Sequence, residues 1–193
     1  MVISAVEVLR ERGADAVTLD AVLTRSGAPR GSIYHHFPGG RSEILADALQ
    51  FAGNAIAVLI ERVAEAGAGR ALGEFSDFWK KILEESNFTA GCPVVSVAVS
   101  NADDDGSHLT SQAGDIFERW CNAMRGALVR DGLSPSSADR LATMVVASVE
   151  GAVVLCRARR SSAPLDDVVR GLDLLIETEK FLARKSVQKR NRR

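Results

Sequence analysis

Apolar residues recur every three or four positions along most of the chain, which is the spacing of a helix that buries one face. The clearest competing pattern is Val-Val-Ser-Val-Ala-Val at residues 94–99, which has local strand propensity. A lone strand among helices would leave its backbone groups unpaired, so we expect a buried helix there, beginning at Pro93. The pattern as a whole predicts an all-α fold.

The first forty residues predict three short helices separated by sharp stops. The first ends at Gly13, and the second begins after Thr18, a good N-cap residue, and ends at Gly27. The third begins near Pro29 and ends before the Pro-Gly-Gly of residues 38–40. This order is typical of the three-helix form of a helix-turn-helix, whose last helix enters the major groove of DNA.

The third short helix has an outer face of hydrogen-bonding side chains. Ile33 and Phe37 are four residues apart and share its apolar face. The polar residues left pointing elsewhere are Arg30, Ser32, Tyr34 and His35. A short helix of this composition suits the groove of a polyanion.

Beyond residue 40 the apolar spacing predicts six more helices, over about residues 41–66, 70–86, 93–101, 109–131, 136–159 and 164–185. The first of these leaves the N-terminal domain and enters the rest of the chain, so we expect it to act as the lever between the two. Of the last two, one is rich in small residues and the other carries a broad apolar stripe. Such surfaces indicate either a dimer built as a four-helix bundle or two ordinary core helices.

The formal net charge of −1 does not itself indicate nucleic-acid binding, but the charges are unevenly distributed. Residues 184–193 contain six Lys and Arg and no acidic residue, and the remaining 18 basic and 25 acidic residues sum to −7. We expect residues 186–193 to form a solvated, disordered tail. The DNA-binding end must then make its contacts with a few well-placed cations.

Chemistry other than DNA binding finds little support. Three cysteines without a CxxC pair, no signal peptide and no apolar run long enough to span a membrane indicate a reduced, cytoplasmic protein. Without Gly-x-Ser-x-Gly, His-Glu-x-x-His or a phosphate-binding glycine loop, we expect no enzyme, no cofactor and no metal. A thiol dyad of Cys92 with His108 has no feature that would activate the cysteine. Asp103, Asp104 and Asp105 with His108 match no established metal site, so we expect a solvated turn.

The N-terminal residues resemble a known family. Residues 18–22 (Thr-Leu-Asp-Ala-Val) and 30–37 (Arg-Gly-Ser-Ile-Tyr-His-His-Phe) are similar to the DNA-binding domain of the TetR family of repressors. Residues 31–41 resemble its LmrA/YxaF-like branch, as does Gly-Cys-Pro-Val at residues 91–94. Two features depart from the family: the chain starts inside the first helix, where relatives carry a basic arm, and Pro29 stands where many have a capping serine.

The resemblance implies a helix-turn-helix DNA-binding domain at residues 1–45 and a helical ligand-binding and dimerisation domain at residues 46–185. It also implies a homodimer that pairs through the last two long helices and binds a pseudo-palindromic double-stranded DNA operator. A small apolar or aromatic effector would release this repressor. The alternative from another class is a helical small-molecule-binding protein whose DNA-binding domain is weak or vestigial.

The residues expected to bind DNA, by side-chain chemistry and by their place in the family motif, are Thr18, Arg30, Gly31, Ser32, Tyr34, His35 and Arg41. The planar fork of Arg30 matches guanine, so Arg30 is expected to read a base. Thr18 and Tyr34 are expected to bond phosphates, and Arg41 is expected to add a cation near one. Ser32 and His35 are secondary readers or phosphate donors, and Gly31 permits close backbone approach. Partly buried packing is the alternative for Tyr34 and the histidines, and it fits His36 equally well.

The residues expected to line an effector cavity are Phe75, Phe78, Trp79, Cys92, Val95, Phe117, Trp120, Met124 and Met144. The aromatic residues pair at helical spacing, and methionines adapt to irregular apolar ligands. Cys92 and Val95 enter through the resemblance at residues 91–94. For any single one of these residues, packing in an ordinary hydrophobic core is about as good an interpretation.

Overall fold

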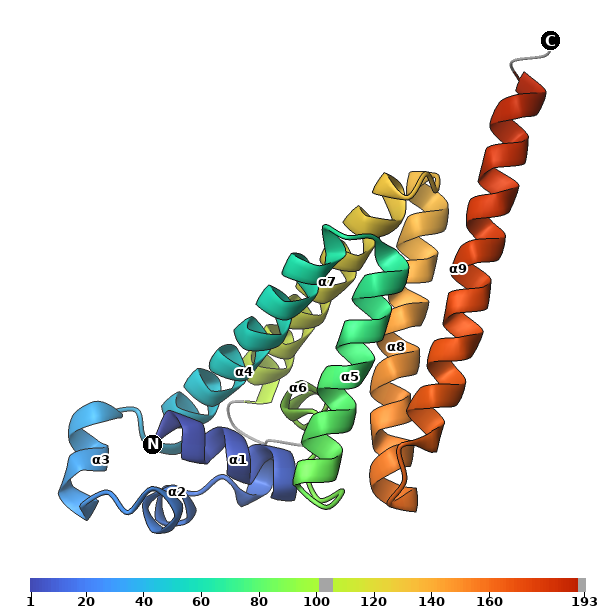
Figure 1. The fold of residues 1–193 in the computed structure, drawn as a ribbon. Helices are drawn as coiled ribbons and strands as arrows, with labels where there is room; N and C mark the ends of the chain where they lie inside the picture. The colour runs from blue at the N-terminus through green and yellow to red at the C-terminus, as the bar shows by residue number, and fades with distance from the viewer. Residues whose placement is uncertain (101–105, 191–193) are drawn as a thin grey trace. The chain divides into compact units, whose positions relative to one another are not determined.

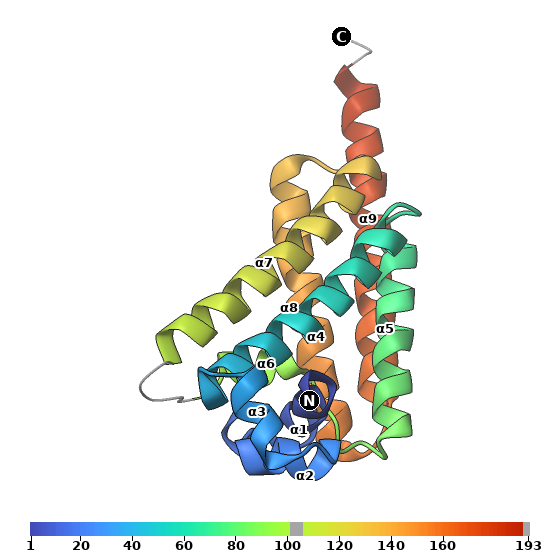
Figure 2. The same cartoon turned by 90° about the vertical axis from the view of Figure 1, so that its left-hand side faces the viewer.

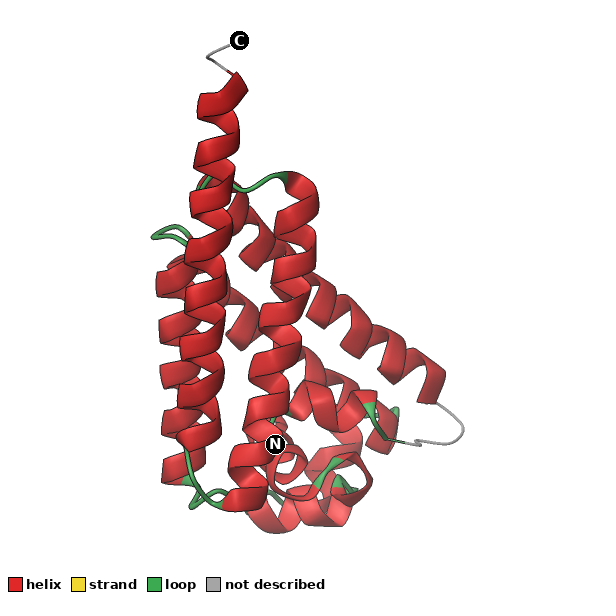
Figure 3. Cartoon of the chain, turned by 90° about the vertical axis from the view of Figure 1, so that its right-hand side faces the viewer, coloured by secondary structure: helices red, strands yellow, loops and turns green. Residues whose placement is uncertain are grey.

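The computed structural model describes residues 1–100 and 106–190, and within these ranges the chain forms nine α-helices and one short 3-10 helix, with no strand (Figures 1 and 3). The predicted all-α fold is therefore confirmed. The acidic turn expected at Asp103, Asp104 and Asp105 lies outside the described residues.

The chain divides into two compact units, one made of residues 1–56 and 89–117 and the other of residues 57–88 and 118–193. The first unit holds α1 (Val2–Arg12), η1 (Ala14–Ala16), α2 (Leu19–Ser26), α3 (Arg30–His36) and α6 (Pro93–Ala98). The second holds α5 (Ala68–Glu85), α8 (Pro135–Arg159) and α9 (Ala163–Arg190). Two helices, α4 (Gly40–Ala64) and α7 (Gly106–Arg130), continue from the first unit into the second.

Local sequence signals set the ends of the N-terminal helices, as predicted. The Thr18 hydroxyl accepts a hydrogen bond from the Ala21 amide at 3.1 Å and caps α2. Gly27 ends α2 in the left-handed region, at φ 67°, and its amide donates to the Leu23 carbonyl at 2.9 Å. Pro29 precedes α3 as its N-cap residue, so the entry to α3 has no side-chain cap.

The stretch with strand propensity is a helix. Pro93 is the first residue of α6, and Val94 and Val97 are buried on its inner side. The Gly91 amide just before it donates to the Arg10 carbonyl of α1 at 2.9 Å. Tertiary packing in the first unit therefore overrides the β propensity of a valine-rich segment.

In the first unit, α4 and α7 approach closely. A Cβ atom built on Gly53 would lie 2.6 Å from Cδ1 and 2.8 Å from Cγ2 of Ile116. The Gln112 side chain of α7 donates to Gln50 Oε1 at 3.1 Å and to the Ala46 carbonyl at 3.4 Å. The glycine is needed because any larger residue would push against a buried, β-branched neighbour.

Replacing Gly53 by alanine should therefore lower the free energy of unfolding by about 1–3 kcal/mol, the usual cost of overpacking. Gly114→Ala is the matched control, because a Cβ atom there meets nothing within 4 Å. That change should stabilise α7 by roughly 0.5–1 kcal/mol, since alanine loses less backbone entropy than glycine. Urea unfolding of both variants measures the difference, and equal stabilisation by the two would contradict the close approach.

The second unit is built on α5, α8 and α9, which run side by side (Figures 1 and 2). Lys80 of α5 pairs with Asp166 of α9 at 2.6 Å. Asp131 accepts a hydrogen bond from the Ala68 amide at 3.2 Å and pairs with Lys180 at 3.3 Å, which ties the start of α5 to α9. The last helix continues to Arg190, so it is longer than the predicted end at residue 185 and includes residues predicted as tail.

Two helices, α4 and α8, are long and apolar enough to cross a membrane by length and composition alone. This corrects the sequence-based expectation that no apolar segment reaches that length. Half of each apolar window is buried inside the protein, as in the core helices of soluble proteins. The buried half of each helix therefore serves the core.

Candidate nucleic-acid interface

The short helix α3 presents a row of exposed polar side chains. Ile33 and Phe37 are buried, 1% and 7% exposed, and anchor the helix to the first unit. The side chains that remain exposed are Arg30, Tyr34, His35 and His36, with Tyr34 at 58%. The predicted division of this helix into an apolar inner face and a polar outer face is confirmed. His36, for which packing was an equal alternative, is exposed, with its ring centroid 5.3 Å from that of His35.

The other residues predicted to bind DNA at the start of α2 and on α3 are Thr18, Gly31 and Ser32. Ser32 donates its hydroxyl hydrogen to the Pro29 carbonyl at 2.7 Å, which helps to close the first turn of α3. A Cβ atom on Gly31 would meet nothing within 4 Å, so the backbone there is open to close approach. Thr18 is exposed and uses its hydroxyl oxygen as the cap of α2, which leaves the hydroxyl hydrogen available to a phosphate.

Arg30 forms an ion pair that the sequence analysis did not anticipate. Its Nη2 lies 3.3 Å from Oδ1 of Asp20 on α2. Both side chains are more than 70% exposed, so the pair contributes little stability and holds Arg30 loosely. The guanidinium therefore remains accessible on the outer side of α3.

Arg41, for which the sequence predicts a cation near a phosphate, contacts two backbone carbonyls. Its Nε donates to the Val17 carbonyl at 2.9 Å and its Nη2 to the Ala14 carbonyl at 2.9 Å, and the side chain is partly buried. Two residues further along α4, Glu43 accepts a hydrogen bond from the Gly39 amide at 2.7 Å. The first turn of α4 thus contacts both the segment before α2 and the turn after α3.

A second ionic cluster joins α1 to α2. Arg25 donates from Nε to Glu7 at 2.7 Å and from both Nη atoms to the Glu11 carboxylate at 2.7 Å. The hydrogen bonds from Arg25 lower the pKa of Glu11, and those to Glu11 and Glu7 raise the pKa of Arg25. Glu7 and Glu11 are four residues apart on one face of α1, which was the available sequence signal for this cluster.

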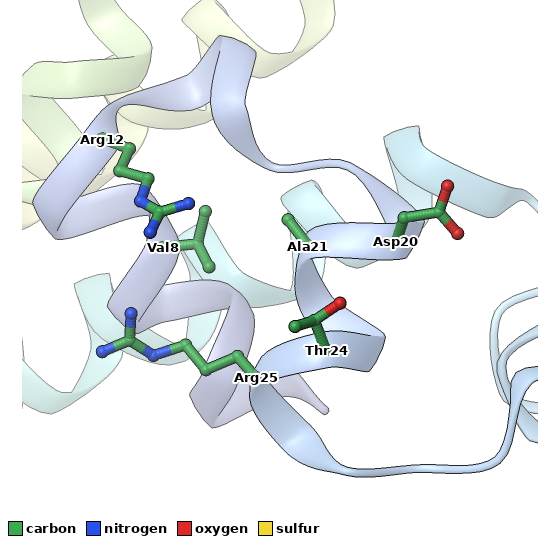
Figure 4. Close-up of a pocket in the computed structure, with 6 residues that line it drawn as sticks. All are labelled: Val8, Arg12, Asp20, Ala21, Thr24 and Arg25. Atoms are coloured by element: carbon green, nitrogen blue, oxygen red, sulfur yellow. The ribbon is translucent and has the colours of Figure 1, made fainter.

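The cluster borders a shallow hollow between α1 and α2 (Figure 4). Its lining residues are Val8, Arg12, Asp20, Ala21, Thr24 and Arg25. Because Arg25 is engaged by two carboxylates, the hollow offers little net positive charge to an anion.

The Arg25 cluster predicts an acid-sensitive part of the stability. A carboxylate whose pKa is lowered on folding stabilises the protein above its unfolded pKa of about 4.3, and this contribution is lost as the pH falls through the folded pKa. Replacing Glu11 by glutamine should lower the free energy of unfolding by about 0.2–1 kcal/mol at pH 7. The gap in this free energy between the variant and the wild type should narrow below about pH 4.

Urea unfolding at several pH values measures that gap for Glu11→Gln. Glu84→Gln, at an exposed position of α5, is the control and should show no such pH-dependent gap. A gap of constant size across the pH range would mean that ionisation of Glu11 contributes nothing.

The predicted effector residues divide between the two units. In the second unit, Phe75, Trp79 and Trp120 are fully buried, with ring centroids 6.3 Å apart in the Phe75–Trp79 and Phe75–Trp120 pairs. Phe78 stacks edge-on to Trp79 at 5.3 Å, and Met124 is buried. We call these five residues the aromatic cluster. The other predicted residues, Cys92, Val95 and Phe117, belong to the first unit, where Cys92 is buried and the other two are partly buried.

Met144 departs from its predicted place. It is 48% exposed and lies on the outer side of α8, whereas its neighbours Val145 and Val149 face the core. It borders a small hollow with Leu141, Leu175 and other residues of α8 and α9. Helical periodicity alone cannot say which side of a helix with apolar residues all round faces inward, and the prediction that Met144 lines the cavity is not supported by this position.

Two buried polar atoms of α5 lack a hydrogen-bond partner among the described residues. They are the Ser76 hydroxyl oxygen, in a residue 1% exposed, and Nε1 of Trp79, in a residue 0% exposed. The two residues are three apart and therefore share one side of α5. Buried donors of this kind are unusual, because leaving one unsatisfied costs about 1–3 kcal/mol.

Neither metal nor thiol chemistry emerges from the described part of the chain. Groups of three or more His, Cys, Asp or Glu able to hold a metal ion do not occur there. The three cysteines form no disulfide. Burial raises the pKa of both Cys121 and Cys156, which disfavours the reactive thiolate.

The chain is similar to transcriptional regulators over nearly its whole length. The profile of the tetR family of bacterial regulatory proteins matches residues 4–48, and that of the LmrA/YxaF-like transcriptional regulator C-terminal domain matches residues 68–171. The uncharacterized HTH-type transcriptional regulator Rv0196 of Mycobacterium tuberculosis is 39% identical over 183 residues, which cover 93% of each chain. The HTH-type transcriptional regulator LmrA of Bacillus subtilis is 27% identical over 165 residues, 84% of this chain and 87% of that protein.

Solved structures share the fold. A TetR transcriptional regulator from Legionella pneumophila superposes with a TM-score of 0.79 at 20% identity, covering 90% of this chain and 94% of that one. A cysteine mutant of the TetR family regulator CifR, complexed with 26-bp double-strand operator DNA, has a TM-score of 0.72 at 19% identity, covering 89% and 92%. At these identities the likeness concerns the fold alone.

Proposed function

Because this chain belongs to the TetR family of transcriptional regulators, with a C-terminal domain of the LmrA/YxaF-like type, we propose that it is a ligand-responsive repressor that binds a pseudo-palindromic operator as a homodimer. The family consists of DNA-binding regulators and is not a family of enzymes. The observation that carries the proposal is the exposed polar face of α3 above the buried Ile33 and Phe37. A repressor of this kind works in the cytoplasm, where the DNA is.

We assign base reading to Arg30 and phosphate contacts to Thr18 and Tyr34. Arg30 is exposed and only loosely held by Asp20, so its fork is available to guanine O6 and N7. Tyr34 and Thr18 are exposed on successive helices and carry hydroxyl donors, which suit phosphate oxygens. His35 adds a donor on the same face, whereas Ser32 can donate to DNA only by releasing the Pro29 carbonyl, and the open backbone at Gly31 allows the helix to approach the groove.

The homodimer would form through α8 and α9. On α8 the exposed apolar or small residues are Met144, Ala147, Gly151, Val154 and Leu155. On α9 they are Gly171, Leu174, Phe181 and Leu182. Within each set the steps are three, four or seven residues, apart from the adjacent pairs at 154–155 and 181–182. Each set therefore keeps to one side of its helix, away from the core, which is the pattern of a helix that packs against another helix. A two-fold pairing of these faces would present two copies of α3 to half-sites one DNA turn apart, about 34–36 Å, or a multiple of it.

The effector would bind at the aromatic cluster. Buried rings suit an apolar or aromatic molecule, and the unpartnered donors of Ser76 and Trp79 favour one that also carries a hydrogen-bond acceptor. The effector would bind better to the state whose recognition helices fit the operator poorly. By reciprocity, operator DNA would weaken effector binding by the same factor, of order 1–3 kcal/mol. Since α4 continues from the first unit into the second, we assign the coupling to a tilt of α4.

Fluorescence anisotropy on DNA flanking the gene of this protein, against unrelated DNA at matched and stated salt, tests operator recognition. A repressor should prefer the flanking DNA. Equal, salt-sensitive binding to both DNAs would place the operator elsewhere. An absence of binding to any DNA would favour the small-molecule-binding alternative, with which the low net charge is consistent.

The effector proposal needs its own test. Small aromatic compounds with and without an acceptor group can be screened by quenching of tryptophan fluorescence, and the compounds that bind can then be added to the protein–DNA complex. An effector must weaken DNA binding, and Trp79→Phe, which keeps a ring and removes the N–H, should weaken its binding. If saturating concentrations of every bound compound leave DNA affinity unchanged, the proposal that an effector releases the protein from DNA is wrong.

A further inference from the structure

Arg41 lies in the first turn of α4 but contacts the chain 24 and 27 residues earlier. Its Nε donates to the Val17 carbonyl and its Nη2 to the Ala14 carbonyl, both at 2.9 Å. Hydrogen bonds from a charged donor are roughly twice as strong as neutral ones. Two of the three guanidinium nitrogens are therefore directed at the protein itself.

The two carbonyls mark the entry to α2. The Ala14 carbonyl also accepts the Val17 amide at 3.1 Å and so closes η1. Val17 is fully buried, and the next residue, Thr18, is the N-cap of α2. A change in the position of these carbonyls would move the first turn of α2, together with the hydroxyl that caps it.

The same turn of α4 also holds the end of α3. Glu43 accepts the Gly39 amide at 2.7 Å, and the Gly40 amide donates to the Phe37 carbonyl at 2.9 Å. Gly40 takes φ 67°, a backbone conformation suited to glycine. Hydrogen bonds thus connect both the start of α2 and the end of α3 to one helical turn, at residues 40–43.

We propose that Arg41 is a positioning residue for DNA recognition, holding the start of α2 in register with α3 through the Ala14 and Val17 carbonyls and acting on affinity without bonding a phosphate. This proposal rests on the DNA-binding function of the chain. It replaces the sequence-based role of Arg41 as a cation beside the DNA backbone. A side chain that spans two carbonyls fixes a geometry, whereas a phosphate contact would chiefly contribute charge.

Two neutral variants separate the roles. In Arg41→Gln, the amide nitrogen stands the same number of bonds from Cα as Nε of arginine, so it can still donate to the Val17 carbonyl. Arg41→Met removes both charge and donor. Positioning predicts that the methionine variant binds operator DNA about tenfold more weakly and that the glutamine variant recovers most of this loss. Both should keep the salt dependence of the wild type, because no phosphate contact is lost.

The control is Arg62→Met, which removes the same charge from an exposed position of the same helix. Anisotropy titrations at several salt concentrations give the slope of log K against log salt for each protein. A phosphate contact instead predicts equal weakening in both Arg41 variants and a slope smaller by about 0.9. That result, or wild-type affinity in Arg41→Met, overturns the proposal.

A measurement without DNA keeps this proposal separate from operator recognition. Amide hydrogen exchange in the free protein should speed up at Val17, Ala21 and Val22 in Arg41→Met and change less in Arg41→Gln. Unchanged exchange at these amides in Arg41→Met overturns the positioning role. If the wild type shows no preference for the flanking DNA but exchange changes as expected, the operator proposal fails and the positioning of α2 by Arg41 stands.

Discussion

Leu174→Arg is expected to convert the proposed homodimer into monomers and to weaken operator binding by at least about 100-fold. Leu174 is 71% exposed in the single chain, on the side of α9 opposite the buried Leu172 and Ile176. In a two-fold interface each substitution occurs twice, so two unpaired charges would be buried at a cost of about 3–5 kcal/mol each. A monomer presents one α3 to DNA and loses the gain from a second, linked half-site.

Sedimentation equilibrium or light scattering after gel filtration reports the oligomeric state of this variant. Val129→Arg, which adds the same charge at an exposed valine of α7, is the control and should remain dimeric. Thermal unfolding should show that both variants stay folded, because neither side chain is in the core. A dimeric Leu174→Arg protein would exclude this face of α9 as the interface.

Arg30→Ala is expected to abolish the preference for one base pair in each half-site while leaving non-specific binding nearly intact. A bidentate arginine–guanine contact contributes about 1–3 kcal/mol of discrimination, or roughly 5- to 150-fold. The side chain is largely exposed and its ion pair with Asp20 is weak, so the loss would come from the DNA contact and not from unfolding.

Anisotropy on the operator and on single-base variants of it measures this effect. The wild type should discriminate at one position where Arg30→Ala does not, and the melting temperatures of the two proteins should agree. Tyr34→Ala makes a useful comparison, because the loss of a phosphate-bonding hydroxyl should weaken binding to all sequences by a similar factor. Uniform weakening by Arg30→Ala would instead assign Arg30 to a phosphate.

The helical architecture was largely readable from the sequence because its signals are local. Thr18 caps the helix that it precedes, Gly27 ends that helix in the left-handed region, and Pro93 begins α6. The pair Ile33 and Phe37 predicted which side of α3 is buried, and therefore which side is left exposed. Each of these features depends on residues within a few positions of one another, so backbone conformation and helical period were enough to infer them.

The tertiary structure alone decided the features that depend on residues distant in the chain. Arg41 meets carbonyls 24 and 27 residues away, Gly53 meets Ile116, and Met144 turns outward on a helix with apolar residues on both sides. No local pattern encodes such contacts, because a side chain's partner is set by how whole helices pack. The sequence by itself determined where the helices lie and which face of α3 is polar. The packing determined which backbone carbonyls Arg41 contacts and which residues remain exposed.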